Sequence, residues 1–329
     1  MNIIVDAMGG DNAPEEIVKG CILAAKDFGE VITLVGRESR IKEILEKENF
    51  SGDNIIIKNA DEVIYGDDEP TAAIRQKKNS SLRVGLEMLH GGQGDVMVSA
   101  GNTGALIAGA TLVVKRIKGV RRVALAPMMP MDNGCFLLVD GGANSECSAA
   151  FLKQFAIMGS IYMEKIMNIN KPRVGLVNIG SEEDKGTEVI NEANKLLKET
   201  PVNYIGYVEG RGIPCGEADV VVCDGFTGNV ILKFMEGMGI VIKGYLKELF
   251  FGGVKSTLAA LLVKDKAKAL AKTLDYTEYG GAPILGCQKP VIKAHGSSNA
   301  KAFYHAVRQA IDVVNNDLVG TIAENIARY

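Results

Sequence analysis

The sequence predicts an α/β fold in which helices cover both faces of a mostly parallel β-sheet. Short, nearly continuous apolar runs rich in Val, Ile and Leu recur along the chain, as in strands buried on both faces. Helix-length segments separate most of these runs, and this alternation is typical of a parallel sheet. The 38 glycines, the absence of Trp and an aromatic content of 6% favour such a sheet over a β-sandwich.

The apolar runs and the segments between them give the expected order of elements. Strands are expected at residues 2–7, 30–36, 54–59, 95–100, 135–140, 173–180, 202–208 and 218–224. Helices are expected between or after them, at residues 14–28, 37–48, 80–90, 147–167, 187–199, 228–249 and 299–315. Because no repeat, Gly/Ser linker or low-complexity tract divides the chain, we expect residues 1–329 to form a single domain.

The composition excludes several classes of protein. A hydrophobic content of 47% is enough for a large core, which excludes a disordered or fibrous chain. The 37 basic and 40 acidic side chains leave a formal net charge of -3, so we expect no nucleic-acid partner.

Cysteine usage and the N-terminus indicate a reduced, cytoplasmic compartment. The six cysteines form no CxxC pair, and Cys21 and Cys223 lie in apolar stretches where a reduced thiol packs as a small hydrophobe. The N-terminus lacks the basic and long apolar regions of a signal peptide. Residues 96–114 carry no charge, but their polar residues and their change from a strand-like to a helix-like pattern argue against a membrane span.

Residues 245–274 differ from the rest of the chain. Two helical patterns follow one another across Gly252 and Gly253 with no strand between them, so we expect a helical hairpin that projects from the sheet. Its apolar residues stand beside lysines. They either form a face buried in the core or a dimer, or they contact a partner or a membrane surface. The side chains proposed for such a contact are Phe250, Phe251, Leu258 and Leu261.

Five expected strands end in similar loops, and in a parallel sheet such loops meet at one edge, where ligands bind. Each loop has a small polar or acidic residue, then glycines, then a helix start. Backbone N–H groups in such loops can bind phosphate without a dedicated motif, although each loop alone is also compatible with an ordinary turn. The loops begin at Asp6, Ser99, Asp140, Asn178 and Asp224.

Several known motifs are absent from the chain. There is no G-x-G-x-x-G, no Gly followed by Lys as in a Walker A loop, and no G-x-S-x-G elbow. Cysteine and histidine spacing gives no zinc site. Paired acidic residues could hold a divalent ion, but nothing in the sequence requires one. His90 and His305 lie in helical patterns and are expected to be structural. His295 opens a polar glycine loop, H-G-S-S-N, and is a candidate for ligand contact.

A basic cluster follows the S-A-G-N-T-G-A segment, with five positive charges in the eight residues 115–122. It is either a solvated surface or a place where an acidic protein or a phosphorylated substrate docks. The residues proposed for the contact are Lys115, Arg116, Arg121 and Arg122.

The motifs together resemble the PlsX family of bacterial phosphate acyltransferases. The resemblance is carried, in order from Met1 to about Ala310, by DAMGGDNAP, SAGNTGA, KRIKGVRRVALAPMMP, LVDGGANSE, NIGSEEDKGTE, CDGFTGNVILK, YGGAPILG and KAHGSSNAKA. It implies a three-layer α/β/α fold similar to isopropylmalate dehydrogenase and phosphotransacetylase, a homodimer, and no cofactor.

The resemblance also implies an activity. The family converts acyl-[acyl carrier protein] and inorganic phosphate into acyl phosphate, which feeds the membrane glycerol-3-phosphate acyltransferase of phospholipid synthesis. Phosphate is the nucleophile, so the site has only to orient it and stabilise an oxyanion. The alternatives are a dehydrogenase on the same sheet and a non-catalytic scaffold that binds the carrier protein.

We predict the site from these loops. Lys185 is the only cation in its polar loop and could pair with phosphate, while Asp224 could orient a neighbouring donor. The alternative for Asp6 and Asp224 is that they only cap helices. The predicted catalytic residues are Lys185, Asp224, Asn229 and His295. The predicted substrate-binding or phosphate-binding residues are Asp6, Gly9, Asn12, Gly101, Asn102, Thr103, Gly225 and Ser297.

Overall fold

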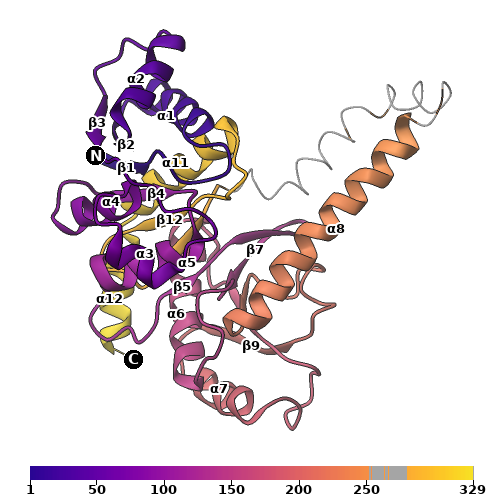
Figure 1. Cartoon of the computed structure of the whole chain (residues 1–329). Coiled ribbons are helices and arrows are strands. Elements are labelled where there is room, and N and C mark those ends of the chain that lie inside the picture. Colours follow the sequence, from indigo (N-terminus) through magenta and orange to yellow (C-terminus); the bar gives the residue numbers. More distant parts are fainter. Residues whose placement is uncertain (252, 254–262, 264–265, 267–279, 329) are drawn as a thin grey trace.

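The computed structural model describes residues 1–251, 253, 263, 266 and 280–328. The strands of this part form two sheets, one above the other in Figure 1. Sheet one has the order β3-β2-β1-β4-β12-β11-β5, and sheet two has the order β6-β7-β10-β8-β9. The predicted α/β class is confirmed, but the predicted strands are divided between two sheets.

Sheet one is parallel except for one strand near its edge. Its parallel strands are β1 (Asn2–Asp6), β2 (Val31–Gly36), β3 (Ile55–Asn59), β4 (Val96–Ser99) and β12 (Val291–Lys293). Strand β11 (Ala282–Leu285) runs antiparallel to β12 and to β5 (Ala124–Leu125). The register pairs Ser99 with both Asp6 and Lys293, so the last residues of β1, β4 and β12 lie side by side.

Helices cover both faces of sheet one because its central strands are apolar on both sides. Ile3 and Val5 face the core shared with α1 (Glu15–Phe28), α2 (Glu38–Lys47) and α11 (Ala300–Asn315). Ile4, between them, faces the opposite core. The second core contains α3 (Pro70–Gln76), α4 (Ser81–His90), α5 (Thr103–Gly109) and the π-helical turn η1 (Ala110–Val114).

Sheet two is also covered on both faces. Its strands are β6 (Met128–Met131), β7 (Gly134–Val139), β8 (Arg173–Val177), β9 (Asn203–Val208) and β10 (Val220–Val222), and only β6 is antiparallel to its neighbour. Helices α6 (Ala149–Lys165) and α7 (Glu188–Lys198) cover one face, and α12 (Leu318–Arg328) packs on α6. The first turns of α8 (Gly225–Phe251) pack on the other face.

One buried cluster of apolar side chains runs from sheet one into sheet two. It joins Ile3 and Val98 of sheet one to Leu137 and Val222 of sheet two through Ala124 and Met128. The two sheets therefore share a buried hydrophobic core. The predicted reduced thiols agree with the structure, in which all six cysteines are free and Cys21 and Cys223 are buried.

Helix α8 is continuous to Phe251, so no new element begins at Tyr245. Figure 1 shows α8 extending away from both sheets after its first turns. The length and composition of residues 225–250 would allow them to cross a membrane, and 11% of their most apolar window is buried. The rest of the predicted hairpin, including Leu258 and Leu261, lies outside the described residues, as does the side chain of Phe251.

The expected elements are found close to their predicted bounds, with some additions. The strand-like stretch before His295 is β12. Strands β5, β6 and β11 and helices α3 and α12 were not predicted, because most are too short to give a periodic pattern. Residues 96–114 form β4, α5 and η1, in agreement with the predicted change from a strand-like to a helix-like pattern.

Candidate active site

A cleft of about 1290 Å³ lies where the two sheets meet. Sheet one contributes the loops after β1, β4 and β12, and sheet two contributes the loop after β7 and the start of α8. Convergence of the strand-end loops was predicted, and four of the five predicted loops contribute to this cleft. Six of the predicted site residues line it: Gly101, Asn102, Thr103, Gly225, Asn229 and His295.

Asp6 lies beneath the cleft, behind the glycines of two loops. Its side chain is 2% exposed and accepts hydrogen bonds from Ser99 Oγ at 2.7 Å and from the Met8 N–H at 3.3 Å. Burial raises the pKa of Asp6, against the opposing effects of hydrogen bonds and of Lys293. The alternative that Asp6 caps a helix does not describe these contacts, because the residue before α1 is Pro14.

Gly9 and Gly101 let the loops after β1 and β4 touch through their backbones. A Cβ on Gly9 would meet Asp6 Oδ2 and would lie 2.8 Å from the Cα and N of Gly101. The Gly101 N–H already donates to Ser99 Oγ at 3.0 Å. Gly9 is therefore needed for packing below the cleft, while Gly101 lines the cleft itself.

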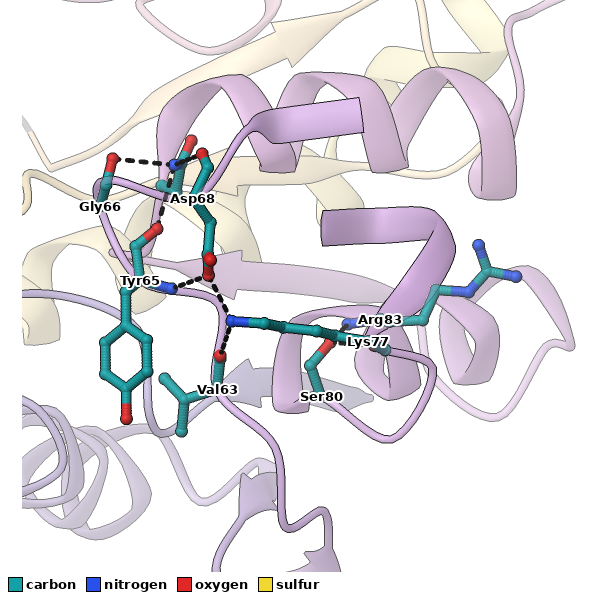
Figure 2. Close-up of polar contacts among 8 residues, drawn as sticks. Val63, Tyr65, Gly66, Asp68, Lys77, Ser80 and Arg83 are labelled. Carbon is teal, nitrogen blue, oxygen red and sulfur yellow. Dashed lines mark hydrogen bonds and ion pairs between the residues drawn. The ribbon is translucent and has the colours of Figure 1, made fainter. Parts of the chain in front are cut away.

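Asn102 links residues 63–68, a loop at the edge of the cleft, to the start of α5. Its Oδ1 accepts from the Ala105 N–H at 3.0 Å, and its Nδ2 donates to the carbonyls of Tyr65, Gly66 and Asp68 at 3.1 to 3.2 Å. Figure 2 shows this loop and its second anchor, Lys77, which bonds Asp68 at 2.5 Å and the Val63 carbonyl at 2.9 Å. Asn102 thus positions residues 63–68, which contribute Val63, Ile64, Tyr65 and Gly66 to the cleft lining.

We expect Asn102→Ala to loosen residues 63–68, because three carbonyls lose a shared donor and each hydrogen bond contributes about 1 kcal/mol. Hydrogen exchange in this loop should rise about tenfold, while exchange in β1 and β2 stays as in wild type. Asn316→Ala is the control, since its Nδ2 donates to the Asp312 carbonyl at the end of α11, far along the chain from this loop. Unchanged exchange at residues 63–68 would contradict the positioning role.

His295 and α8 face each other across the cleft. Nε2 of His295 lies 3.8 Å from Glu236 Oε1, and Glu236 Oε2 pairs with Lys233 Nζ at 2.8 Å. Nδ1 of His295 lies 2.8 Å from Ser297 Oγ and accepts from the Ser297 N–H at 3.3 Å, which assigns the proton of the neutral ring to Nε2. Burial lowers the pKa of His295, with Glu236 opposing.

The start of α8 supplies two predicted residues directly. Asn229 is exposed and lines the cleft opposite Gly142, and Gly225 donates its N–H to the Asn144 carbonyl at 2.6 Å. Asp224 accepts from the N–H and Oγ1 of Thr227 at 2.8 and 3.0 Å. These contacts are those of a helix cap, the alternative considered for Asp224.

Other predicted residues lie outside the cleft lining. Lys185 is exposed in the loop after β8, where its N–H donates to the Glu182 carbonyl. Asn12 donates to the carbonyls of Ser297 and Ser298 at 3.2 and 3.3 Å, and so ties the loops after β1 and β12.

The basic cluster lies at the surface beside α6 and not in the cleft lining. Lys115, Arg121 and Arg122 are exposed, and Arg116 is partly exposed and donates to the Arg121 carbonyl. Arg122 lies 5.5 Å from the centre of the Phe151 ring.

Lys293, the last residue of β12, was not predicted as a site residue. Its side chain is 8% exposed, lines the cleft, and donates to the carbonyls of Ala100 at 3.0 Å and Ala294 at 2.5 Å. Burial lowers the pKa of Lys293 to about 8. The available signal was a lysine inside an otherwise apolar strand, directly before the H-G-S-S-N loop. In the part of the chain that the structure describes, no three His, Cys, Asp or Glu residues cluster as metal ligands.

Residues 1–320 match the family described as "Fatty acid synthesis protein". The phosphate acyltransferase of Thermoanaerobacter pseudethanolicus is 50% identical over 99% of this chain and 97% of its own length. The chain belongs to the phosphate acyltransferase family. Another member, from Caldanaerobacter subterraneus subsp. tengcongensis, is 49% identical over the same shares of both chains.

The family's fold is also found in solved structures of distant sequence. A phosphotransacetylase from Streptococcus pyogenes superposes with a TM-score of 0.65 at 16% identity, covering 96% of this chain and 94% of its own. The EutD phosphotransacetylase from Staphylococcus aureus gives 0.60, also at 16% identity, covering 95% and 94%. The predicted likeness to the phosphotransacetylase fold is therefore confirmed.

Proposed function

We propose that this protein transfers a fatty acyl group from the thioester of an acyl carrier protein to inorganic phosphate, giving acyl phosphate for phospholipid synthesis. The observation that carries the proposal is the cleft, in which glycine loops, a buried lysine and polar side chains from both sheets surround a space large enough for both substrates. Membership of the phosphate acyltransferase family supports the same reaction.

The chemistry needs no nucleophilic side chain. A phosphate oxygen attacks the thioester carbonyl, an oxyanion develops, and the C–S bond then breaks. Thr103, Asn229 and His295 line the cleft and supply hydroxyl, amide and imidazole donors for phosphate or for the oxyanion. Lys185 and Asp224 keep only an indirect role in this proposal, because neither lines the cleft.

The carrier protein and the second copy of the chain are proposed from surfaces outside the cleft. Carrier proteins of this kind are acidic, so the basic cluster 115–122 is the surface proposed to meet one. Helix α8 exposes large apolar side chains that suit a homodimer or contact with a membrane that holds glycerol-3-phosphate acyltransferase. These side chains include Phe234, Ile240, Tyr245 and Leu249. We propose a cytoplasmic protein with this peripheral contact and no cofactor.

The test is the loss of acyl-carrier thioester on addition of phosphate to the full chain, followed as free thiol and acyl phosphate. We expect turnover that needs phosphate and continues in chelator without nucleotide. Consumption that requires a nicotinamide, or binding of the carrier without turnover, would instead favour a dehydrogenase or a scaffold. Arg121→Glu with Arg122→Glu should raise the KM for the carrier thioester about tenfold, but leave the KM for a short acyl-pantetheine thioester unchanged.

A further inference from the structure

The proposed reaction requires a proton to move within the cleft. Near neutral pH phosphate enters largely as the hydrogen phosphate dianion, and acyl phosphate leaves as a dianion without that proton. The alkyl thiol that departs has a pKa near ~8.5 and leaves as the protonated thiol. A group between the two substrates therefore has to take a proton from phosphate and give one to sulfur, while the C–O bond forms and the C–S bond breaks.

We propose that Lys293 is the catalytic residue that carries this proton, from its ammonium group to the leaving sulfur, and that it regains a proton from the attacking phosphate. This inference rests on the proposed function. No oxidant, metal or further reactant is needed, because the proton lost by phosphate equals the proton gained by the thiol.

The position of Lys293 is fixed by the backbone around it. It ends β12 beside Ser99 of β4, at the carboxyl edge where the strand-end loops meet. Two of its three ammonium protons are directed to the carbonyls of Ala100 and Ala294. The third is left for a substrate in the cleft that Lys293 lines. The hydrogen bonds to these two carbonyls restrict the side chain of Lys293 to fewer rotamers than a surface lysine adopts.

Other cations lining the cleft are less suited to this role. Arg37 and Arg40 are exposed, and a guanidinium does not release its proton in proteins. Lys233 is exposed and paired with Glu236. Among the described residues that line the cleft, Lys293 is the one buried cation.

The charges around Lys293 suit proton exchange with a thiol. Burial is the largest effect and lowers the pKa of Lys293 to about 8, near that of the departing thiol. Asp6 on β1 and Asp11 in the loop after β1 oppose this decrease, and Lys233 on α8 adds to it. His295 follows two residues later, and burial lowers its pKa too, which disfavours the imidazolium form as a proton donor.

The experiment compares two leaving groups on the full-length protein. One substrate is an alkyl thioester, acyl-pantetheine, and the other is an acyl thiophenol ester, whose more acidic thiol leaves without a proton. We expect Lys293→Met and Lys293→Arg each to lower kcat on the alkyl thioester by about 10² to 10⁴-fold. On the aryl thioester the loss should be under about tenfold, with the KM for phosphate near wild type. Arg keeps the positive charge, so its failure separates proton transfer from charge alone.

Lys289→Met is the matched control, because Lys289 is exposed and lies two residues before the start of the same strand. Wild-type kcat on the alkyl thioester should fall as pH rises above about 8, where Lys293 loses its proton, and the fall should be absent on the aryl thioester. The pH profile is measured on the wild-type protein, so it does not depend on whether a variant folds.

Three results would overturn the inference. Equal losses on both esters, or a large rise in the KM for phosphate, would make Lys293 a phosphate-binding residue. A wild-type pH profile that is the same for both esters would also refute it. Wild-type protein that consumes neither ester on addition of phosphate would instead overturn the proposed function, and this inference with it.

Discussion

Asp140→Ala is expected to lower the free energy of unfolding by about 4 kcal/mol and the Tm by on the order of 10 °C. Asp140 directly follows β7 with its side chain buried, and its carboxylate accepts five hydrogen bonds. Four come from the backbone N–H groups of Leu125, Gly142, Ala143 and Asn144, at 2.7 to 3.1 Å. Removing the carboxylate leaves these donors without their acceptor, and each buried donor left unpaired costs about 1–3 kcal/mol of stability.

The effect should also reach the cleft, because Asp140 joins the two sheets. Leu125 belongs to β5 of sheet one, and the Asn144 carbonyl accepts from the N–H of Gly225 at the start of α8. Asp95→Ala is the matched control. Asp95 is partly buried and accepts from the Asn2 N–H at 2.7 Å, so we expect a loss of about 1 kcal/mol. Chemical denaturation measures the free energy of unfolding of both variants. Equal losses of stability would contradict the role assigned to Asp140.

The strands that the sequence predicts well are those that form long apolar runs. Strands β1, β2 and β10 are buried on both faces, so hydrophobicity alone reveals them. Strand β5 has two residues and β6 includes Pro130, and neither length nor composition separates them from a loop. The division into two sheets was not predictable, because alternation of strand and helix does not say which strands are neighbours. Strand β12 pairs with β4 across almost two hundred residues of chain.

The candidate site was predictable to the extent that it depends on strand ends. The loops after β1 and β4 were expected to converge, and they do so beside the loop after β12. Lys185 follows β8, and β10 lies between β8 and β7 in the sheet. This strand order cannot be read from the sequence. Lys293 was not predicted as a site residue, because the apolar residues beside it indicated only a strand. Glu236 was not predicted because only the fold brings this residue of α8 opposite His295.

Gly228→Ala is expected to destabilise the protein by about 3 kcal/mol, although Ala normally favours a helix by about 1 kcal/mol over Gly. Gly228 lies in the first turn of α8, directly against the end of β7. A Cβ at this position would overlap the Asp140 carbonyl oxygen and approach Cys223 Sγ to 3.0 Å. Because the obstacle is backbone, α8 itself has to move. That shift carries Asn229 and Glu236 out of place in the cleft, and a displacement of about 1 Å can cost about 10²-fold in turnover.

Gly237→Ala gives the same substitution in the same helix without the obstacle, since no described heavy atom lies within 4 Å of the added Cβ. We expect this control to keep wild-type turnover and to gain up to about 1 kcal/mol in stability. Thermal unfolding and phosphate-dependent thioester consumption, measured on both variants, make the comparison. If Gly228→Ala behaves like Gly237→Ala in both measurements, then close contact between β7 and α8 does not hold the cleft in shape. A loss of turnover at an unchanged Tm would mean that α8 shifts without weakening the core, which still assigns Gly228 to the alignment of the two sheets.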